Sequence, residues 1–149
     1  MAQITQNKKA FHDYSILEKM EAGIVLFGHE VKAVKGGQIN LKGSYISIDK
    51  NNEAWIIGCH ISPYRHASQS LSGYDPLRPR KLLLNKYQVD YLSEKLHERG
   101  LTILPLSVYT KGSLIKIEIG VARGKKKHDK RESIKKRTIE REIGRRLKS

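Results

Sequence analysis

The sequence predicts a mainly β protein: an OB-like small closed barrel of about six strands, with two or three short helices and a basic C-terminal tail. Over most of the chain apolar residues alternate with polar ones, and the strand-like segments are short and separated by turns. Positive charge is concentrated after residue 122. Alternation of period two predicts half-buried strands, and short strands without βαβ alternation favour a small barrel.

The strand prediction is clearest for residues 113–121. Their apolar side chains share one face and are Ile115, Ile117, Ile119 and Val121. Lys116 therefore points outward. A turn at residues 110–113 joins this segment to a strand over residues 101–109, in which Pro105 predicts an edge or a bulge. The remaining expected strands are residues 14–20, 24–28, 45–48 and 54–61.

Two helices are expected between these strands. The first spans residues 29–35 and ends at a pair of glycines. The second spans residues 85–99, where Asn85 has the character of an N-cap, Gln88 takes the capping-box position and Gly100 follows the last turn. Residues 62–80 form a long irregular stretch, which is typical of either a functional loop or a mobile one.

The charge distribution divides the chain in two. The 149 residues include 29 Lys and Arg against 15 Asp and Glu, for a net charge of +14, and residues 123–149 alone contribute +9. We therefore predict an RNA-binding barrel over residues 1–122 and a basic tail over residues 123–149. Too few apolar residues lie in the tail to hold it folded, so it is expected to be disordered when free. Ile139, Ile143 and Leu147 would stripe one face if it became helical on a polyanion.

Several classes of function are disfavoured. The apolar runs are too short for a membrane span, and the N-terminus lacks the features of a secretory signal. The single cysteine, Cys59, agrees with a reducing cytoplasm. The histidines show no metal-ligand spacing, and no nucleophile motif is present. We therefore expect a cytoplasmic protein that is not an enzyme and has no metal, no cofactor and no small-molecule substrate.

A basic tail instead indicates a polyanionic partner, because each neutralised phosphate releases counterions. The sequence shows no helix-turn-helix or zinc-finger pattern, which would indicate a DNA-binding protein. RNA is therefore favoured as the partner. Two alternatives stay open at this point. The tail is either simply solvated, or it is an amphipathic helix on an anionic membrane, which three aliphatic residues support only weakly.

The chain resembles the SsrA-binding proteins, also called small protein B, from residue 7 to about residue 137. The shared motifs are Asn7-Lys8-Lys9-Ala10, Asp13-Tyr14, Glu21-Ala22-Gly23-Ile24, Gly28-His29-Glu30-Val31-Lys32, Ser44-Tyr45, Arg80-Lys81-Leu82-Leu83-Leu84, Gly100-Leu101-Thr102, Pro105-Leu106 and the stretch from Lys116 to Arg131. Each motif is weak alone, whereas their order along the whole chain is specific.

The resemblance implies an OB-like barrel that binds the tRNA-like end of transfer-messenger RNA. With elongation factor Tu, such a protein brings this RNA to stalled ribosomes for trans-translation rescue. Its tail, helical on the ribosome, would enter the empty mRNA channel and the decoding centre of the small subunit. The alternative function is a ribosomal or cold-shock-like RNA-binding protein without a rescue role.

The resemblance also implies contact residues. On the barrel, the expected RNA contacts are Glu21, Glu30, Lys32, Leu83 and Lys116. In the tail, the expected RNA and ribosome contacts are Lys125, Lys126, Lys127, His128, Asp129, Lys130, Arg131, Lys135, Lys136 and Arg137. Residue type alone leaves simpler roles open: Glu21 could shape a turn, Glu30 could open a helix and Leu83 could lie in the core.

Overall fold

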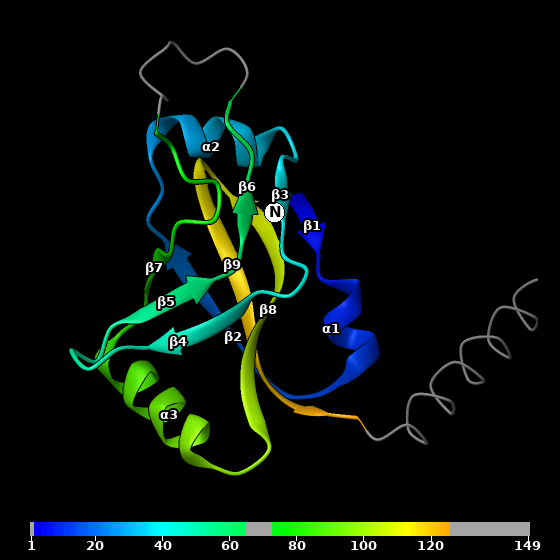
Figure 1. Ribbon diagram of the computed structural model, residues 1–149, viewed down its shortest axis with the longest axis vertical. Helices are drawn as coiled ribbons and strands as arrows, with labels where there is room; N and C mark the ends of the chain where they lie inside the picture. The colour runs from blue at the N-terminus through cyan, green and yellow to red at the C-terminus, as the bar shows by residue number, and fades with distance from the viewer. Residues whose placement is uncertain (1, 65–72, 126–149) are drawn as a thin grey trace, which may run out of the picture.

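The computed structural model of the chain describes residues 2–64 and 73–125 (Figure 1). Within them, seven strands form one antiparallel sheet in the order β1-β8-β9-β2-β7-β5-β4, and β3 pairs with β6. The strands are β1 (Ala2–Gln6), β2 (Tyr14–Ile24), β3 (Ile39–Asn40), β4 (Tyr45–Ile48), β5 (Ala54–Ile57), β6 (His60–Ile61), β7 (Arg80–Leu83), β8 (Leu101–Lys111) and β9 (Leu114–Gly124). The helices are α1 (Lys8–Asp13), α2 (Gly28–Lys35) and α3 (Lys86–His97).

The long hairpin β8–β9 confirms the strongest strand prediction. Its alternating apolar residues are all buried and are Ile115, Ile117, Ile119 and Val121. Lys116 lies on the opposite face, as the alternation requires. The register of β8 shifts between Pro105 and Ser107, which is the predicted irregularity at the proline. β9 continues to Gly124, two residues beyond the boundary predicted at residue 122.

Both predicted helices are present, but α3 ends at His97 with Glu98 as its C-cap, two residues before the predicted end at residue 99, so Gly100 is not its C′ glycine. Asn85 caps α3, because its side chain accepts from the backbone N–H of Gln88 and the Gln88 side chain accepts in return from the Asn85 N–H. Gly100 follows at φ +82°, a left-handed conformation that favours glycine. α2 begins at Gly28, and the Glu30 side chain accepts from the Phe27 N–H at 2.8 Å.

Several strand boundaries were wrong. The predicted strand at residues 24–28 is absent from the described chain, because β2 runs unbroken through Ile24 and α2 starts at Gly28. The predicted strand at residues 54–61 is divided at Gly58, whose φ of +78° ends the extended backbone. β1, β3, β7 and α1 were not expected, and the described residues hold nine strands rather than about six. β7 has the sequence Arg80-Lys81-Leu82-Leu83, whose alternation is too short to stand out from its apolar neighbours.

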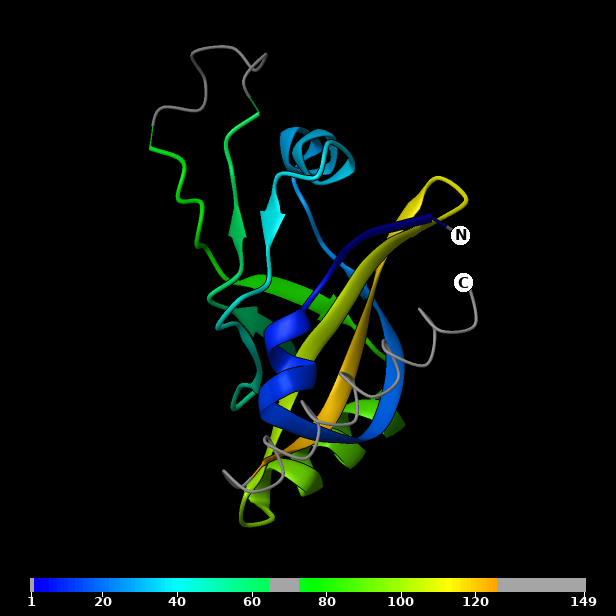
Figure 2. The same cartoon turned by 90° about the vertical axis from the view of Figure 1, so that its right-hand side faces the viewer.

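The described strands do not close into the expected barrel. β1 and β4 are the two edges of the hydrogen-bonded order, and β4 lies beside β8 without pairing with it. The main core fills the space between these strands, and Leu92 of α3 is buried in it. α1 lies across β8 on the other face, as Figure 2 shows, where Ala10 packs with Leu104, Leu106 and Ala122.

No helix of the described residues is both long and apolar enough to cross a membrane. Within residues 2–64 and 73–125, no group of three or more His, Cys, Asp or Glu side chains is placed to hold a metal ion.

Candidate nucleic-acid interface

Three of the five predicted barrel residues meet on one exposed face of the sheet. Leu83 of β7 pairs with Gly23 of β2, Gly23 pairs with Lys116 of β9, and Lys116 pairs with Tyr109 of β8. Directly opposed residues point to the same face of a sheet. These four residues therefore form one row across four strands. Together with Glu21, we call them the sheet-face surface.

Glu21 lies one row away, two residues before Gly23 on β2. Its carboxylate accepts a hydrogen bond from the Tyr109 hydroxyl and lies 3.4 Å from Nζ of Lys111. The hydrogen bond from Tyr109 is the largest influence and lowers the pKa of Glu21; burial raises it, and Lys111 and Lys116 lower it, so that the pKa lies below its ordinary value. Glu21 is therefore an oriented, ionised acceptor at neutral pH.

Leu83 is exposed to 55%, so it is not part of the core. It lies over Gly23, where an added Cβ would come within 3.1 Å of the Leu83 Cβ. The absence of a side chain at Gly23 lets the leucine lie flat against the sheet. An exposed aliphatic group on the same face as a cation is suited to pack on a ribose or a base while the cation pairs with phosphate.

Glu30 does not lie on this surface, and its predicted contact with RNA is wrong for the described conformation. Its side chain is 0% exposed, and its carboxylate accepts from the guanidinium groups of Arg78 and Arg80 and from the Tyr74 hydroxyl. Burial raises its pKa, but the hydrogen bonds, led by that from Arg78, lower it to about 2. Glu30 is therefore a buried anion that ties α2 to the segment before β7.

Arg80 is the second buried member of this ion cluster. It is 0% exposed and donates to Glu30, to the Cys59 carbonyl at 2.6 Å and to the Pro76 carbonyl at 2.9 Å. The cluster also positions Arg78, whose guanidinium lies 3.8 Å from the centre of the half-exposed Phe27 ring. Part of the irregular stretch predicted at residues 62–80 is thus held firmly against α2.

Lys32 is exposed on α2, and its Nζ lies 5.8 Å from the centre of the Tyr64 ring. The structure brings it together with Glu30 on one helix rather than with the sheet-face surface. Of the predicted tail residues, only Lys125 is described. Its N–H donates to the Asp13 carbonyl at 2.9 Å, and its Nζ lies 3.2 Å from the Phe11 carbonyl. The predicted contacts from Lys126 to Arg137 lie outside the described residues.

Sequence reasoning missed Tyr109 and Lys111 as members of the site. Both lie on β8, and only the register of β8 against β9 places them beside Lys116 and Glu21. A signal was present, because Tyr109 falls on the polar side of a predicted strand, where an aromatic residue is unusual. The hairpin of β8 with β9 was predicted, but the pairing of β2 with β9, which brings Glu21 beside Tyr109, is not visible in the sequence.

Fold and surface together are those of a β-sheet protein equipped to bind nucleic acid, with a cation, a tyrosine and an apolar side chain on one open face. Comparison with known proteins gives the family. A family model described as "SmpB protein" matches residues 4–149. The chain belongs to this family.

Its relatives match over nearly the whole chain. The "SsrA-binding protein" of Sulfurihydrogenibium sp. is 51% identical over 140 residues, covering 94% of this chain and 90% of the relative. That of Oleidesulfovibrio alaskensis is 50% identical and covers 98% and 92%. A chain in the solved structure "tmRNA-SmpB: a journey to the center of the bacterial ribosome" is similar at a TM-score of 0.68 and 38% identity, covering 87% of this chain and 93% of that one.

Proposed function

We propose that this chain binds the tRNA-like end of transfer-messenger RNA through the sheet-face surface and brings it to stalled ribosomes. The proposal is supported by the names of its relatives, which are SsrA-binding proteins, and by the similar solved chain, which is named with transfer-messenger RNA and the ribosome. The observation that carries it is the row from Leu83 to Lys116, which places a cation and an exposed leucine on the same face of the sheet with only Gly23 between them.

Each member of the surface has a chemical task in this proposal. The Lys116 ammonium pairs with a phosphate, and Leu83 packs against a ribose or a base. Glu21, held ionised by Tyr109, accepts from a 2′-hydroxyl or from the exocyclic amino group of guanine. Contacts of this kind suit structured RNA, whose minor groove presents 2′-hydroxyls.

The proposed division of labour follows the charge. Residues 1–122 hold the RNA, and the tail of residues 123–149, with its net charge of +9, enters the empty mRNA channel and the decoding centre as a helix. There His128 stacks on a base, and cations such as Lys130 and Arg131 pair with ribosomal phosphates. Elongation factor Tu joins through the RNA complex, in the cytoplasm.

The binding surface is tested by a matched pair of lysine variants. We expect Lys116→Ala to weaken binding of the tRNA-like domain and Lys86→Ala, on the exposed start of α3, to leave it unchanged. Thermal melting of both variants should match the parent chain, because neither lysine is buried. Equal affinities for the two variants would contradict the assignment of the surface.

RNA specificity separates this function from its alternative. A rescue protein binds transfer-messenger RNA in preference to bulk ribosomal RNA, whereas a ribosomal or cold-shock-like protein shows no such preference. If five to eight phosphates are neutralised, the log–log salt slope should be about −4 to −7. A flat salt dependence would contradict the electrostatic part of the proposal.

The tail is tested by ending the chain after Lys125, which keeps β9 and its contacts with Asp13 intact. We expect the shortened chain to fold and to bind the tRNA-like domain, but to fail in rescue of stalled ribosomes in a reconstituted translation system. Full rescue activity without the tail would contradict its proposed role.

A further inference from the structure

A second candidate site lies along the edge of β8, where the pairing with β1 ends. β1 pairs with β8 only as far as Gln6 and Ser107, after which the chain turns away into α1. Beyond this point no described strand is hydrogen-bonded to that edge of β8, and β4 approaches it without pairing. The space between α1, the start of β4 and the start of β8 is a pocket of about 390 Å³, which we call the seam pocket.

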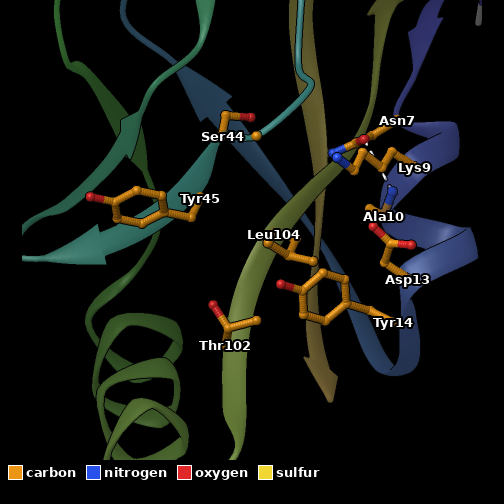
Figure 3. Close-up of a pocket in the computed structure, with 10 residues that line it drawn as sticks. Asn7, Lys9, Ala10, Asp13, Tyr14, Ser44, Tyr45, Thr102 and Leu104 are labelled. Carbon is orange, nitrogen blue, oxygen red and sulfur yellow. Dashed lines mark hydrogen bonds between the residues drawn. The ribbon is translucent and has the colours of Figure 1, made fainter. Parts of the chain in front are cut away.

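Asn7 fixes the position of α1 relative to the unpaired edge of β8, and so fixes the shape of the seam pocket. Its backbone N–H donates to the Leu106 carbonyl at 2.7 Å, and its side-chain amide donates to the Pro105 carbonyl at 2.8 Å. Its side-chain oxygen accepts from the Ala10 N–H at 3.2 Å, the dashed line in Figure 3. Because Asn7 is only 6% exposed and both ends of its side chain are engaged, α1 is fixed relative to β8. The pocket is therefore preformed.

The lining combines apolar surface with a few polar groups. Leu104 of β8 lines the pocket, and the Tyr14 ring points toward it, whereas the Tyr45 ring extends outward from the pocket rim, away from Leu104 (Figure 3). Tyr45 is 46% exposed. The polar lining includes the Thr102 hydroxyl, the Lys9 ammonium and the Asp13 carboxylate, one oxygen of which lies 2.8 Å from Nδ1 of His12. Aromatic rings bind bases by stacking, and a nearby ammonium pairs with phosphate.

Further lysine side chains lie on the surface next to the seam pocket. A neighbouring groove along the end of β1 and the start of α1 is lined by Lys8, Lys9 and Lys42. Lys125, the last described residue, hydrogen-bonds to the far end of α1. A line of cations that leaves the pocket fits a chain of phosphates better than one phosphate. The volume is within the range of about 300 to 1,000 Å³ for small-ligand sites.

We propose that the seam pocket binds one unpaired nucleotide of a single-stranded RNA segment. The base stacks on the exposed Tyr45 ring at the rim of the pocket, and the phosphate chain runs toward Lys9. Thr102 and Asp13 hydrogen-bond to the edge of the base. The seam pocket shares no residue with the sheet-face surface, so the protein holds two different parts of its RNA partners. The inference rests on the proposed function for the choice of RNA as the partner.

The test uses fluorescein-labelled pentaadenylate and pentauridylate, which have no stable structure, and the full chain in an anisotropy titration. We expect Tyr45→Ala to weaken pentamer binding about five- to a hundredfold, the range for loss of one base–aromatic stack. Tyr45→Phe keeps the ring and should keep the affinity. Tyr87→Ala is the matched control, because Tyr87 is 88% exposed on α3, away from the pocket.

Two results would overturn the seam pocket: no saturable pentamer binding, or equal affinities for Tyr45→Ala and Tyr87→Ala. Lys116→Ala separates this proposal from the previous one, because it should weaken binding of the tRNA-like domain and leave pentamer binding unchanged. A Tyr45-dependent pentamer site would stand even if Lys116→Ala had no effect on the larger RNA. Thermal melting of the Tyr45 variants confirms that the fold is intact.

Discussion

Glu30→Gln is the substitution that separates a structural role from a direct contact with RNA. The change keeps the size of the side chain and removes the charge that neutralises two guanidinium groups, of which Arg80 is 0% exposed. Breaking a buried ion pair by removing one partner costs about 3–5 kcal/mol. For a chain of this length, a loss of 1 kcal/mol lowers Tm by about 2–4 °C. We therefore expect Tm to fall by about 6–20 °C.

The lowered pKa of Glu30 gives a second estimate of how much its charge contributes to the free energy of unfolding. Hydrogen bonds lower it to about 2, from an ordinary value of 4.5. A carboxyl with a lowered folded-state pKa stabilises the fold above pH 4.5, and this contribution is lost as pH falls from about 4.5 toward 2. At about 1.4 kcal/mol for each pH unit, the contribution is about 3 kcal/mol. Glu30→Gln should therefore flatten the loss of stability in this pH range.

The assays are urea denaturation between pH 3 and 7 and RNA binding well below Tm. Glu94→Gln, at an exposed position on α3, is the matched control and should change neither measurement. We expect Glu30→Gln to retain affinity for the tRNA-like domain while it is folded. A variant as stable as the parent chain but unable to bind RNA would refute this reasoning and restore Glu30 as a contact residue.

Three further predictions concern packing and reactivity. Gly23→Ala should weaken RNA binding with little loss of Tm, because its Cβ would lie 3.1 Å from the Leu83 Cβ and displace that leucine; unchanged RNA affinity would contradict this. Gly120→Ala should lower the free energy of unfolding by about 1–3 kcal/mol, because its Cβ would lie 2.7 Å from Leu106 Cδ1. Gly36→Ala is the control and should leave the free energy of unfolding unchanged, because its Cβ would have no contact closer than 3.5 Å. Urea denaturation of the two variants compares them. Cys59 should react with a thiol reagent only on unfolding, since it is 1% exposed and burial raises its pKa to about 11; rapid labelling of the native chain would contradict its burial.

Much of the fold was predictable because local patterns determine it. The alternation through Ile115 and Val121 predicts β9 and the outward side of Lys116, and the capping residues Asn85 and Gln88 predict the start of α3. β1 and β7 were missed because their short sequences carry no distinctive period. Their places follow from pairing with β8 and β2, which depends on contacts distant in sequence. For the same reason, the open edges of the sheet were not predicted.

The candidate site was likewise predictable where neighbours on one strand determine it and unpredictable where distant contacts do. Lys116 was placed outward by its neighbours on one strand, but Leu83 and Glu21 were assigned by resemblance, and only the strand register brings the three together. Glu30 was assigned as an RNA contact by resemblance, whereas residue type alone left open a role at the start of a helix, where its side chain does accept from the Phe27 N–H. Its burial depends on Arg78 and Arg80, 48 and 50 residues away in the sequence.

The central claim is that the sheet-face surface holds the tRNA-like end of transfer-messenger RNA, and titration of that RNA domain into isotope-labelled chain tests it most directly. The backbone amide signals of Gly23, Leu83, Tyr109 and Lys116 should shift together and saturate at one equivalent, with those of α3 unmoved. Shifts confined to α3, or to residues beyond Lys125, would contradict the claim.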